Sequence, residues 1–256
     1  MFTALESTDT HIDFSNEIQE NEEHNILNFM NIYAGAGVGV GDINNDGLTD
    51  IFFAGNIVPD RLYVNKGGFN FEDITARSGI NNKGWSTGVS MVDINQDGWL
   101  DIYVAVSGGA ESPEKANKLY INQKKNTFTE EGESYGLADT SQSTHAAFFD
   151  YDRDGDLDMF LIINPVDYTM SSVNTIRARK LNGESNSTDK LYRNNGDNTF
   201  TDVSAESGIL IEGYSLGLGI SDIDNDGWPD VYVSNDFLTN DILYRNNGDG
   251  TFSDVS

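Results

Sequence analysis

Short apolar runs alternate with polar turns along most of the chain, and they recur in the same order four times. Each unit holds a run of alternating apolar and small residues, an acidic nine-residue stretch, a continuous apolar run, a Leu-Tyr-x-Asn segment and a later Phe. Runs of this length, bounded by Asp, Asn and Gly, are typical of β-strands. The pattern predicts units of four strands from residue 34 onward, after an acidic lead-in over residues 1–33.

The four strands of each unit are expected at equivalent places. The inner strands, in which small residues permit close approach, are expected at residues 37–41, 88–92, 145–149 and 217–221. Buried second strands follow at residues 51–54, 102–106, 159–163 and 231–233. Third strands follow at residues 62–65, 119–122, 191–194 and 243–246, and fourth strands at Phe71, Phe128, Phe200 and Phe252. In the lead-in, residues 2–5 and 11–14 are compatible with short strands, and residues 17–30 with a helical turn or a loop.

The spacing between these segments shows where the units differ. From each Phe to the first Asp of the next acidic stretch the distance is 22 residues, whereas from that Asp to its own Phe it is 29, 35, 50 and 30 residues. All variation therefore lies between strands two and three. In an antiparallel meander this loop shares one end with the connector to the next unit, opposite the acidic stretch. Repeats that vary on one face usually bind ligands there, and the longest insertion is residues 164–189.

The acidic stretch follows the pattern D-x-[DN]-x-D-G-x-x-D. Side-chain oxygens at positions 1, 3, 5 and 9, with the main-chain carbonyl of position 7, suit Ca²⁺, which takes six to eight oxygen ligands. The alternative is an Asp/Asn/Gly hairpin turn without metal. An EF-hand is excluded because position 12 is apolar in all four copies instead of Glu. The expected ligands of about four Ca²⁺ ions are Asp42, Asn44, Asp46, Leu48, Asp50, Asp93, Asn95, Asp97, Trp99, Asp101, Asp150, Asp152, Asp154, Asp156, Asp158, Asp222, Asp224, Asp226, Trp228 and Asp230.

Units of about 50 residues with four strands fit the blades of an all-β β-propeller. The pattern D-x-[DN]-x-D-G-x-x-D-[IV], followed by LYxNxGxxxFxD, resembles the FG-GAP/VCBS repeats of the integrin-α-type propeller, as in bacterial ASPIC/UnbV-type surface proteins. The resemblance covers residues 34–256, with blades expected at 34–80, 81–137, 138–209 and 210–256. It implies a seven-bladed family with Ca²⁺ in the hairpin loops and a secreted or surface-anchored binding role. Here we expect about four blades, either as a fragment of a longer chain that holds the remaining blades or another domain, or as a partial propeller.

Composition narrows the function further. The net charge is −27, and 15 of the 42 acidic residues lie in the four loops. Four Ca²⁺ ions would add eight positive charges and leave −19, which still disfavours nucleic acid as a partner. There is no cysteine, no apolar stretch of membrane-spanning length and no signal peptide at the start. Loops built from Asp and Asn without a bidentate Glu are expected to bind Ca²⁺ weakly, which favours an extracellular or cell-surface setting, with the export signal absent from this chain.

Two stretches match the nucleophile-elbow pattern G-x-S-x-G, at residues 84–88 and 213–217. A catalytic elbow occurs once, between a strand and a helix. Two copies at the same place in the repeat indicate a structural role at the junction between units instead, so no catalytic residue is expected.

Several residues at the variable end are candidates for ligand contact. His145 has either a structural role or a contact with ligand. Aromatic residues near the connectors either stack on a sugar or peptide or pack between blades: Trp85, Tyr214 and Tyr33. A basic cluster in the long insertion either docks an acidic ligand or bridges nearby carboxylates: Arg177, Arg179 and Lys180.

The sequence therefore predicts a calcium-stabilised extracellular propeller that acts as a binding or adhesion module for a protein or glycan, with the ligand opposite the calcium loops. The alternatives are a propeller-based carbohydrate-active enzyme, a lyase or hydrolase, and a structural spacer in a larger surface protein.

Overall fold

The structure is a computed structural model that describes residues 3–22, 24–27, 32–107, 114–164, 181–236 and 239–256. Within this part the chain forms four antiparallel sheets, each with four strands in sequence order. The first sheet contains β1 (Val38–Gly41), β2 (Asp50–Phe53), β3 (Arg61–Asn65) and β4 (Phe71–Asp73). The second contains β5 (Trp85–Val92), β6 (Asp101–Ser107), β7 (Lys118–Asn122) and β8 (Phe128–Glu130).

The third and fourth sheets repeat this order. The third contains β9 (Ser143–Phe149), β10 (Asp158–Ile163), β11 (Lys190–Asn194) and β12 (Phe200–Asp202). The fourth contains β13 (Ser215–Ser221), β14 (Asp230–Asn235), β15 (Ile242–Asn246) and β16 (Phe252–Asp254). The predicted all-β, propeller-type blades are thus confirmed. Three of the four inner strands begin two or three residues earlier than expected, with a register shift near each start.

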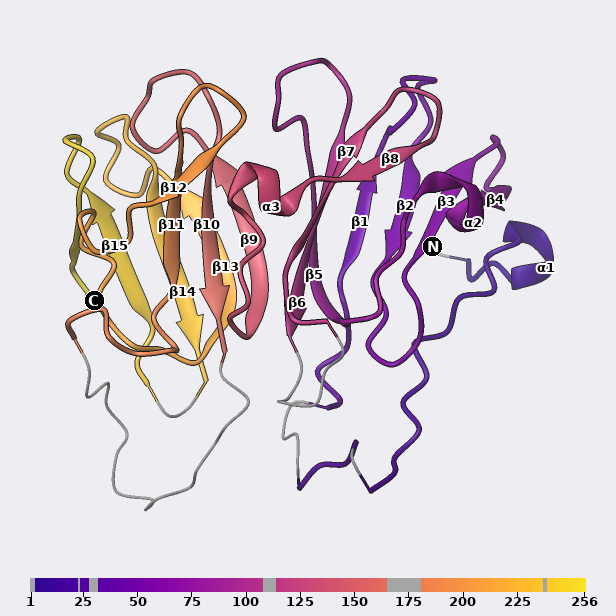
Figure 1. The fold of residues 1–256 in the computed structure, drawn as a ribbon, viewed down its shortest axis with the longest axis horizontal. Helices are drawn as coiled ribbons and strands as arrows, with labels where there is room; N and C mark the ends of the chain where they lie inside the picture. The colour runs from indigo at the N-terminus through magenta and orange to yellow at the C-terminus, as the bar shows by residue number, and fades with distance from the viewer. Residues whose placement is uncertain (1–2, 23, 28–31, 108–113, 165–180, 237–238) are drawn as a thin grey trace.

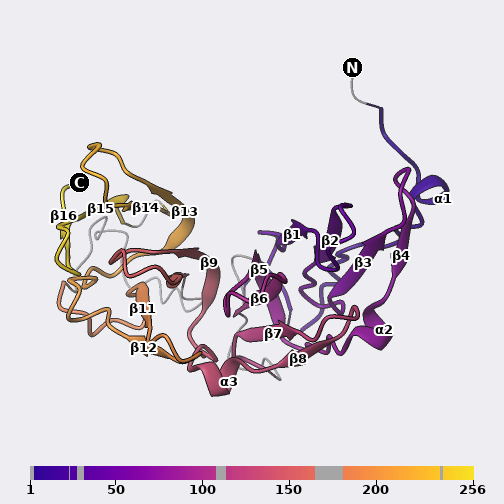
Figure 2. The ribbon, with the colours of Figure 1, turned by 90° about the horizontal axis from the view of Figure 1, so that it is seen from above.

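The sheets stand side by side in an open arc, with the first strand of each on the hollow side and the fourth strand on the outside (Figure 2). The hairpin loops between first and second strands lie at the upper edge of Figure 1. The second strands end and the third strands begin at the lower edge, where the connectors lead into the next first strand. We call these two edges the loop end and the insertion end. The meander predicted from the spacing therefore places insertions and acidic loops at opposite ends.

The core lies between the sheets and is divided into three clusters, each shared by two neighbouring sheets. The same position of the second strand is an aromatic residue that packs against the following sheet in each of the first three units. These residues, each 0% exposed, are Phe52, Tyr103 and Phe160. Burial of such large side chains stabilises each contact by roughly 1.5–3 kcal/mol. The sheets therefore hold one another in place through the equivalent residues of successive units.

Small residues in the inner strands permit close approach, as predicted. A Cβ added at Gly37 would lie 2.8 Å from the backbone N of Val89, and one added at Gly88 would lie 2.5 Å from the carbonyl O of Thr144. Both distances are too short for a side chain, so the inner strands of the first three sheets meet at glycines.

The connectors contain two short helices that the sequence pattern did not predict, α2 (Thr75–Ser78) and α3 (Gly132–Tyr135). Each ends at a glycine with positive φ, Gly79 at +87° and Gly136 at +76°. A Cβ at Gly136 would lie 2.9 Å from the carbonyl O of Phe200 in the next unit. One turn of helix is too short to show a helical period in the sequence.

The short strands considered for the lead-in are wrong over its described residues. The structure has a four-residue helix, α1 (Ser7–Thr10), and residues 11–20 form no strand or helix. Residues 17–22 and 24–27 are loop and turn, while Phe2 and residues 28–30 lie outside the described residues. Residues 11–18 form no strand because they lie across the face of the first sheet and contact it with their side chains. They do not pair with the backbone of an edge strand.

Candidate functional site

The acidic loops are folded by their own side chains. In the first loop, Asp42 Oδ1 and Asn44 Oδ1 both accept from the backbone N–H of Asp46, at 3.1 and 3.0 Å. Asp42 Oδ2 accepts from the N–H of Gly47 at 2.7 Å, and Asp46 Oδ1 accepts from the N–H of Leu48 at 2.9 Å. Positions 1, 3 and 5 of the loop thus gather their oxygens around a single turn of backbone.

The other three loops repeat this hydrogen-bond pattern residue by residue. Position 6 is a glycine with φ between +83° and +100° in all four loops. Position 4 also has positive φ, at Asn45, Gln96, Arg153 and Asn225. A left-handed residue followed two positions later by glycine turns the chain sharply enough to bring the oxygens together.

The ninth residue of each loop ties the loop to the sheet. Asp50 accepts from the N–H of Ile43 in the loop at 3.0 Å and from the N–H of Asn65 in β3 at 2.8 Å. Equivalent bonds are made by Asp101, Asp158 and Asp230. All four carboxylates are at most 1% exposed. Burial raises the pKa of Asp101 and of Asp158 to about 7, despite these hydrogen bonds.

The carboxylates come closest together in the third and fourth loops. One oxygen each of Asp150, Asp152 and Asp158 lie within 4.8 Å of one another, and the same holds for Asp222, Asp224 and Asp226. In the first two loops position 3 is an asparagine, whose amide oxygen takes the same place in the hydrogen-bond pattern. The structure therefore brings the predicted oxygens of positions 1 and 3 together in all four loops.

Asp156, at position 7 of the third loop, departs from its expected role. Only its main-chain carbonyl was predicted to face a cation, yet its carboxylate Oδ1 is buried and has no hydrogen-bond partner within the described residues. Burial, together with the neighbouring Asp154, raises the pKa of Asp156 to about 6. Among the described residues, one salt bridge reaches the four loops, from Lys124 Nζ to Asp97 Oδ2 at 3.4 Å. Clustered oxygens with so few positive neighbours fit a hard divalent cation such as Ca²⁺.

The loops are also joined sideways into a row. Asn45 Nδ2 donates to the carbonyl O of Gly98 in the second loop at 2.9 Å, and Gln96 Nε2 donates to that of Gly155 in the third at 3.1 Å. The guanidinium of Arg153 lies 5.2 Å from the centre of the Trp228 ring in the fourth. Position 4 of each of the first three loops therefore contacts the next loop, so the shape of one affects its neighbour.

A second polar contact between units lies at the insertion end, and it was not predicted. Asp189, which is 1% exposed, accepts from the N–H of Ile163 at 2.8 Å and from the hydroxyl of Ser215 in the next sheet at 2.9 Å. Burial raises the pKa of Asp189 to about 7. In the second unit Asn117 takes this place, and its Nδ2 donates to the hydroxyl of Ser143 at 2.9 Å. The sequence signal is an Asp or Asn two residues before each Leu-Tyr pair.

This contact explains the two G-x-S-x-G matches. Ser86 and Ser215 are both 0% exposed. Ser215 donates to Asp189, and Ser86 lies in hydrogen-bond contact with Asp60, the equivalent carboxylate of the first unit. Both hydroxyls are buried and hydrogen-bonded, so neither is open to a substrate. This agrees with a structural role for the two serines at the junctions between units.

The aromatic and histidine candidates of the insertion end have different surroundings. Trp85 is 6% exposed and packs with Ile32, so it belongs to the interior. Tyr33 is 61% exposed and donates its hydroxyl to Glu20 at 2.6 Å, whereas Tyr214 is partly buried. His145 is partly buried, and burial lowers its pKa, which favours the neutral ring. The basic residues Arg177, Arg179 and Lys180 lie outside the described residues.

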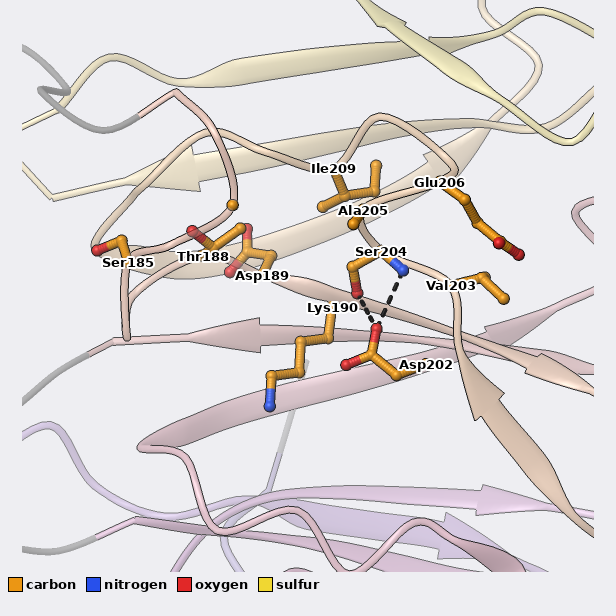
Figure 3. Close-up of a pocket in the computed structure, with 11 residues that line it drawn as sticks. Ser185, Thr188, Asp189, Lys190, Asp202, Val203, Ser204, Ala205, Glu206 and Ile209 are labelled. Carbon is orange, nitrogen blue, oxygen red and sulfur yellow. Dashed lines mark hydrogen bonds between the residues drawn. The ribbon is translucent and has the colours of Figure 1, made fainter.

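A cavity of about 440 Å³ opens at the insertion end of the third sheet. It lies between residues 183–190, which lead into β11, and residues 202–209, which follow β12 (Figure 3). Thr188 lines it and is 6% exposed, and its hydroxyl has no hydrogen-bond partner in the described part of the chain. Asp202 and Glu206 add carboxylates, and Ile209 an apolar wall (Figure 3). A buried hydroxyl without a partner leaves a hydrogen bond for a ligand to make.

The FG-GAP-like repeat family matches residues 42–104, 105–161, 180–233 and 222–256. The chain belongs to this family. The first match contains the acidic loops at 42–50 and 93–101, the second contains the loop at 150–158, and the third and fourth both contain the loop at 222–230.

The curated relatives include cartilage acidic protein 1 from Mus musculus, 28% identical over 206 residues, which cover 78% of this chain and 29% of the relative. The protein of the same name from Homo sapiens is 26% identical over 202 residues, 78% of this chain and 28% of the relative. The protein of the same name from Xenopus tropicalis is 28% identical over 212 residues, which cover 80% of this chain and 29% of the relative. The chain thus spans less than a third of the length of these relatives.

Among solved structures, an Agrocybe aegerita lectin that recognises non-reducing terminal N-acetylglucosamine aligns with a TM-score of 0.46 and 19% identity. The alignment covers 84% of this chain and 50% of the lectin. None of the helices in the described part of the chain has the length and apolar character that a membrane crossing requires.

Proposed function

We propose that the protein is a calcium-stabilised extracellular binding module, in which Ca²⁺ has a structural role at the loop end and the ligand binds at the insertion end. The observation that carries the proposal is the convergence of carboxylate oxygens from Asp150, Asp152 and Asp158 within 4.8 Å. Asp158 is also the residue that ties the loop to β11 through the N–H of Asn194. A cation held by this group would compensate a buried charge and fix the hairpin at the same time.

The residues that would hold calcium are the side chains at positions 1, 3, 5 and 9 of each loop, with the carbonyl of position 7 and, in the third loop, the carboxylate of Asp156. When bound, Ca²⁺ supplies charge neutralisation and no redox chemistry. Loops without a bidentate Glu belong at the weak end of the calcium range, at roughly 10⁻⁴ to 10⁻³ M, which matches extracellular calcium. This supports an extracellular setting.

The ligand is placed at the insertion end because the cavity beside Thr188 lies there and because this end carries all the length variation between units. Two carboxylates of the cavity lining, Asp202 and Glu206, outnumber its one basic residue, Lys190, which already pairs with Asp139. The cavity therefore favours a neutral or cationic group, such as a glycan or a basic segment of a protein.

Calcium binding is tested by titration calorimetry on the wild type and on a variant with Asp152→Ala and Asp154→Ala. We expect the variant to bind one ion fewer and to melt at a lower temperature in millimolar Ca²⁺. Asp9→Ala, an exposed aspartate of α1, is the control and should change neither. Equal stoichiometry and equal melting temperatures in Ca²⁺ for variant and wild type would refute the structural role of the metal.

Two other functions are distinguishable from this one. A carbohydrate-active enzyme would turn over a glycan, whereas a binding module retains it unchanged, so a screen of anionic and neutral glycans that measures both turnover and retention separates them. A structural spacer would retain no ligand at all. The burial of Ser86 and Ser215 argues against a serine hydrolase.

A further inference from the structure

The asparagine that ends the third strand of the second unit bonds two acidic loops at once. Asn122 ends β7 and is 3% exposed. Its side-chain Nδ2 donates to the carbonyl O of Ile43, at position 2 of the first loop, at 2.8 Å. Its backbone N–H donates to Asp101 Oδ1, at position 9 of the second loop, at 2.7 Å. One buried residue therefore joins the loops of two neighbouring units.

The path of hydrogen bonds continues on the other side of Ile43. The backbone N–H of Ile43 donates to Asp50 Oδ2, at position 9 of the first loop, at 3.0 Å. Asp50 and Asp101, each 0% exposed, are thus joined through Ile43 and Asn122. Both carboxylates are proposed calcium ligands, so the position of one constrains the position of the other through buried groups.

The third and fourth loops are joined in the same way. Asn246, which is 1% exposed, donates from Nδ2 to the carbonyl O of Tyr151 at 2.9 Å. The N–H of Tyr151 donates to Asp158 Oδ2 at 3.2 Å, and the N–H of Asn246 donates to Asp230 Oδ1 at 2.8 Å. The path again runs from the ninth position of one loop to the ninth position of the next.

The second and third loops lack this path in the described part of the chain. The equivalent asparagine is Asn194, whose Nδ2 donates to the carbonyl O of Leu157 in its own unit at 3.2 Å. Among the described residues it makes no bond to Ile94, which is position 2 of the second loop. Asn122 and Asn246 instead bond both their own unit and the preceding one. The four loops are therefore joined as two pairs.

The contacts made from position 4 do not divide the loops in this way. Asn45, Gln96 and Arg153 each reach the following loop, so contacts of this kind are present at all three junctions. The buried asparagine is what distinguishes the first and third junctions from the second.

We propose that the four loops bind calcium as two coupled pairs, the first with the second and the third with the fourth, and that Asn122 and Asn246 are the positioning residues that couple them. The inference rests on the proposed function, because it takes the loops to be calcium sites. When binding fixes the ninth Asp of one loop, the path of hydrogen bonds fixes the backbone around its counterpart, and less of the second loop is left to order. Each site therefore raises the affinity of its partner, and the effect is reciprocal.

The test uses terbium(III), an ion that binds oxygen ligands as calcium does and emits when a nearby indole is excited. Trp99 and Trp228 stand at position 7 of the second and fourth loops. Trp85, the remaining tryptophan, is 6% exposed and lies at the insertion end. In the whole chain with Trp228→Phe, terbium emission therefore reports binding to the second loop.

Two matched variants each remove two carboxylates from a loop beside the second one. One carries Asp42→Asn and Asp46→Asn in the first loop, and the other carries Asp150→Asn and Asp154→Asn in the third. Because both remove the same charge from an adjacent loop, a through-space effect is common to both. We expect the first variant to raise the half-saturating terbium concentration roughly three- to tenfold more than the second does, which is the equilibrium effect of one hydrogen bond. With Asn122→Ala added, the two variants should have equal effects.

The other pair is measured through Trp228, in the chain with Trp99→Phe. There the variant of the third loop should raise the half-saturating concentration for the fourth, and Asn246→Ala should reduce this effect. If Asn122→Ala does not fold, as judged by circular dichroism, the comparison of the two matched variants in the chain that keeps Asn122 decides alone.

Two results would overturn the proposal. One is an equal shift from the two matched variants in the chain that keeps Asn122. The other is a larger shift from the first loop that persists in folded Asn122→Ala, since the coupling would then follow another path. Either result, with saturable binding, leaves calcium sites without pairs and the proposed function intact. A chain that binds neither terbium nor calcium saturably would refute the proposed function as well.

Discussion

The buried carboxylate of Asp189 provides the sharpest prediction, because the chain contains its own comparison. In the second unit the same place is held by Asn117, which accepts from the N–H of Val106 at 2.7 Å and donates to the hydroxyl of Ser143. An asparagine at position 189 can make the same bonds to Ile163 and Ser215 without burying a charge. We therefore expect Asp189→Asn to preserve the fold and to change how stability depends on pH.

The magnitude follows from the raised pKa. Since the pKa of Asp189 is about 7 in the folded state, against 3.8 in a free side chain, its protonated form is the one that suits the fold. The contribution of Asp189 to the free energy of unfolding is fully present below its unfolded-state pKa of 3.8, and it is lost as the pH rises through the folded-state pKa of about 7. Between pH 5 and pH 8 the loss comes to roughly 2–3 kcal/mol for an ideal single site.

The assay is urea unfolding of wild type and Asp189→Asn at pH 5 and pH 8, with the calcium concentration held constant. From pH 5 to pH 8, the free energy of unfolding of the variant should increase by roughly 2–3 kcal/mol relative to that of the wild type. Asn117→Asp should show the reverse, with stability that falls as the pH rises. An Asp189→Asn variant that is less stable than the wild type at pH 8 would show that the ionised carboxylate stabilises the contact between sheets, and the reasoning would be wrong.

Two further substitutions test the contacts between units. Gly136→Ala should cost about 1–3 kcal/mol in urea unfolding, because the residue has φ of +76° and its Cβ would lie 2.9 Å from the carbonyl O of Phe200. Asn122→Ala should cost about 2–4 kcal/mol, since it removes the bond from Nδ2 to the carbonyl O of Ile43 in the preceding unit at 2.8 Å, together with bonds within its own sheet. Asn194→Ala, whose side chain bonds only within its own unit among the contacts of the described residues, should lose less stability in the same assay. Equal losses for the two asparagines would contradict the role given to the bond between units.

The repeat and its strands could be predicted from the sequence because each strand has its own signal. The acidic stretch, the apolar run and the Leu-Tyr-x-Asn segment are local patterns, and their constant spacing identified which end of the sheets would vary. The oxygens that we propose as calcium ligands were identified from the same pattern, and the structure brings those of positions 1 and 3 together in every loop. The buried carboxylate of Asp156 was missed because position 7 carries Asp in only one loop.

What could not be predicted depends on contacts between distant residues. The hydrogen bond between Asp189 and Ser215 joins residues that are 26 positions apart in the sequence. The equivalent position is Asn117 in the second unit, so the acidic residue does not recur in every unit. The packing of residues 11–18 across the first sheet is recognisable only once Phe14 is seen to stack on Phe53 and Asp13 to accept from the hydroxyl of Tyr63. The alternating pattern of residues 11–18 resembles that of a strand, but a strand needs an edge to pair with, and these residues lie across a face instead.

The most direct test of the central claim is a thermal melt of the whole chain in millimolar Ca²⁺ and again with a chelator. If each site binds at about 0.1 mM, 1 mM Ca²⁺ should stabilise the fold by about 1.4 kcal/mol per site and by roughly 5–6 kcal/mol for four sites. We expect a large rise in melting temperature with Ca²⁺ and none with Mg²⁺ at the same concentration. The same melting temperature in calcium and in chelator would mean that the four loops are turns held by their own hydrogen bonds, and the structural role of calcium would be wrong.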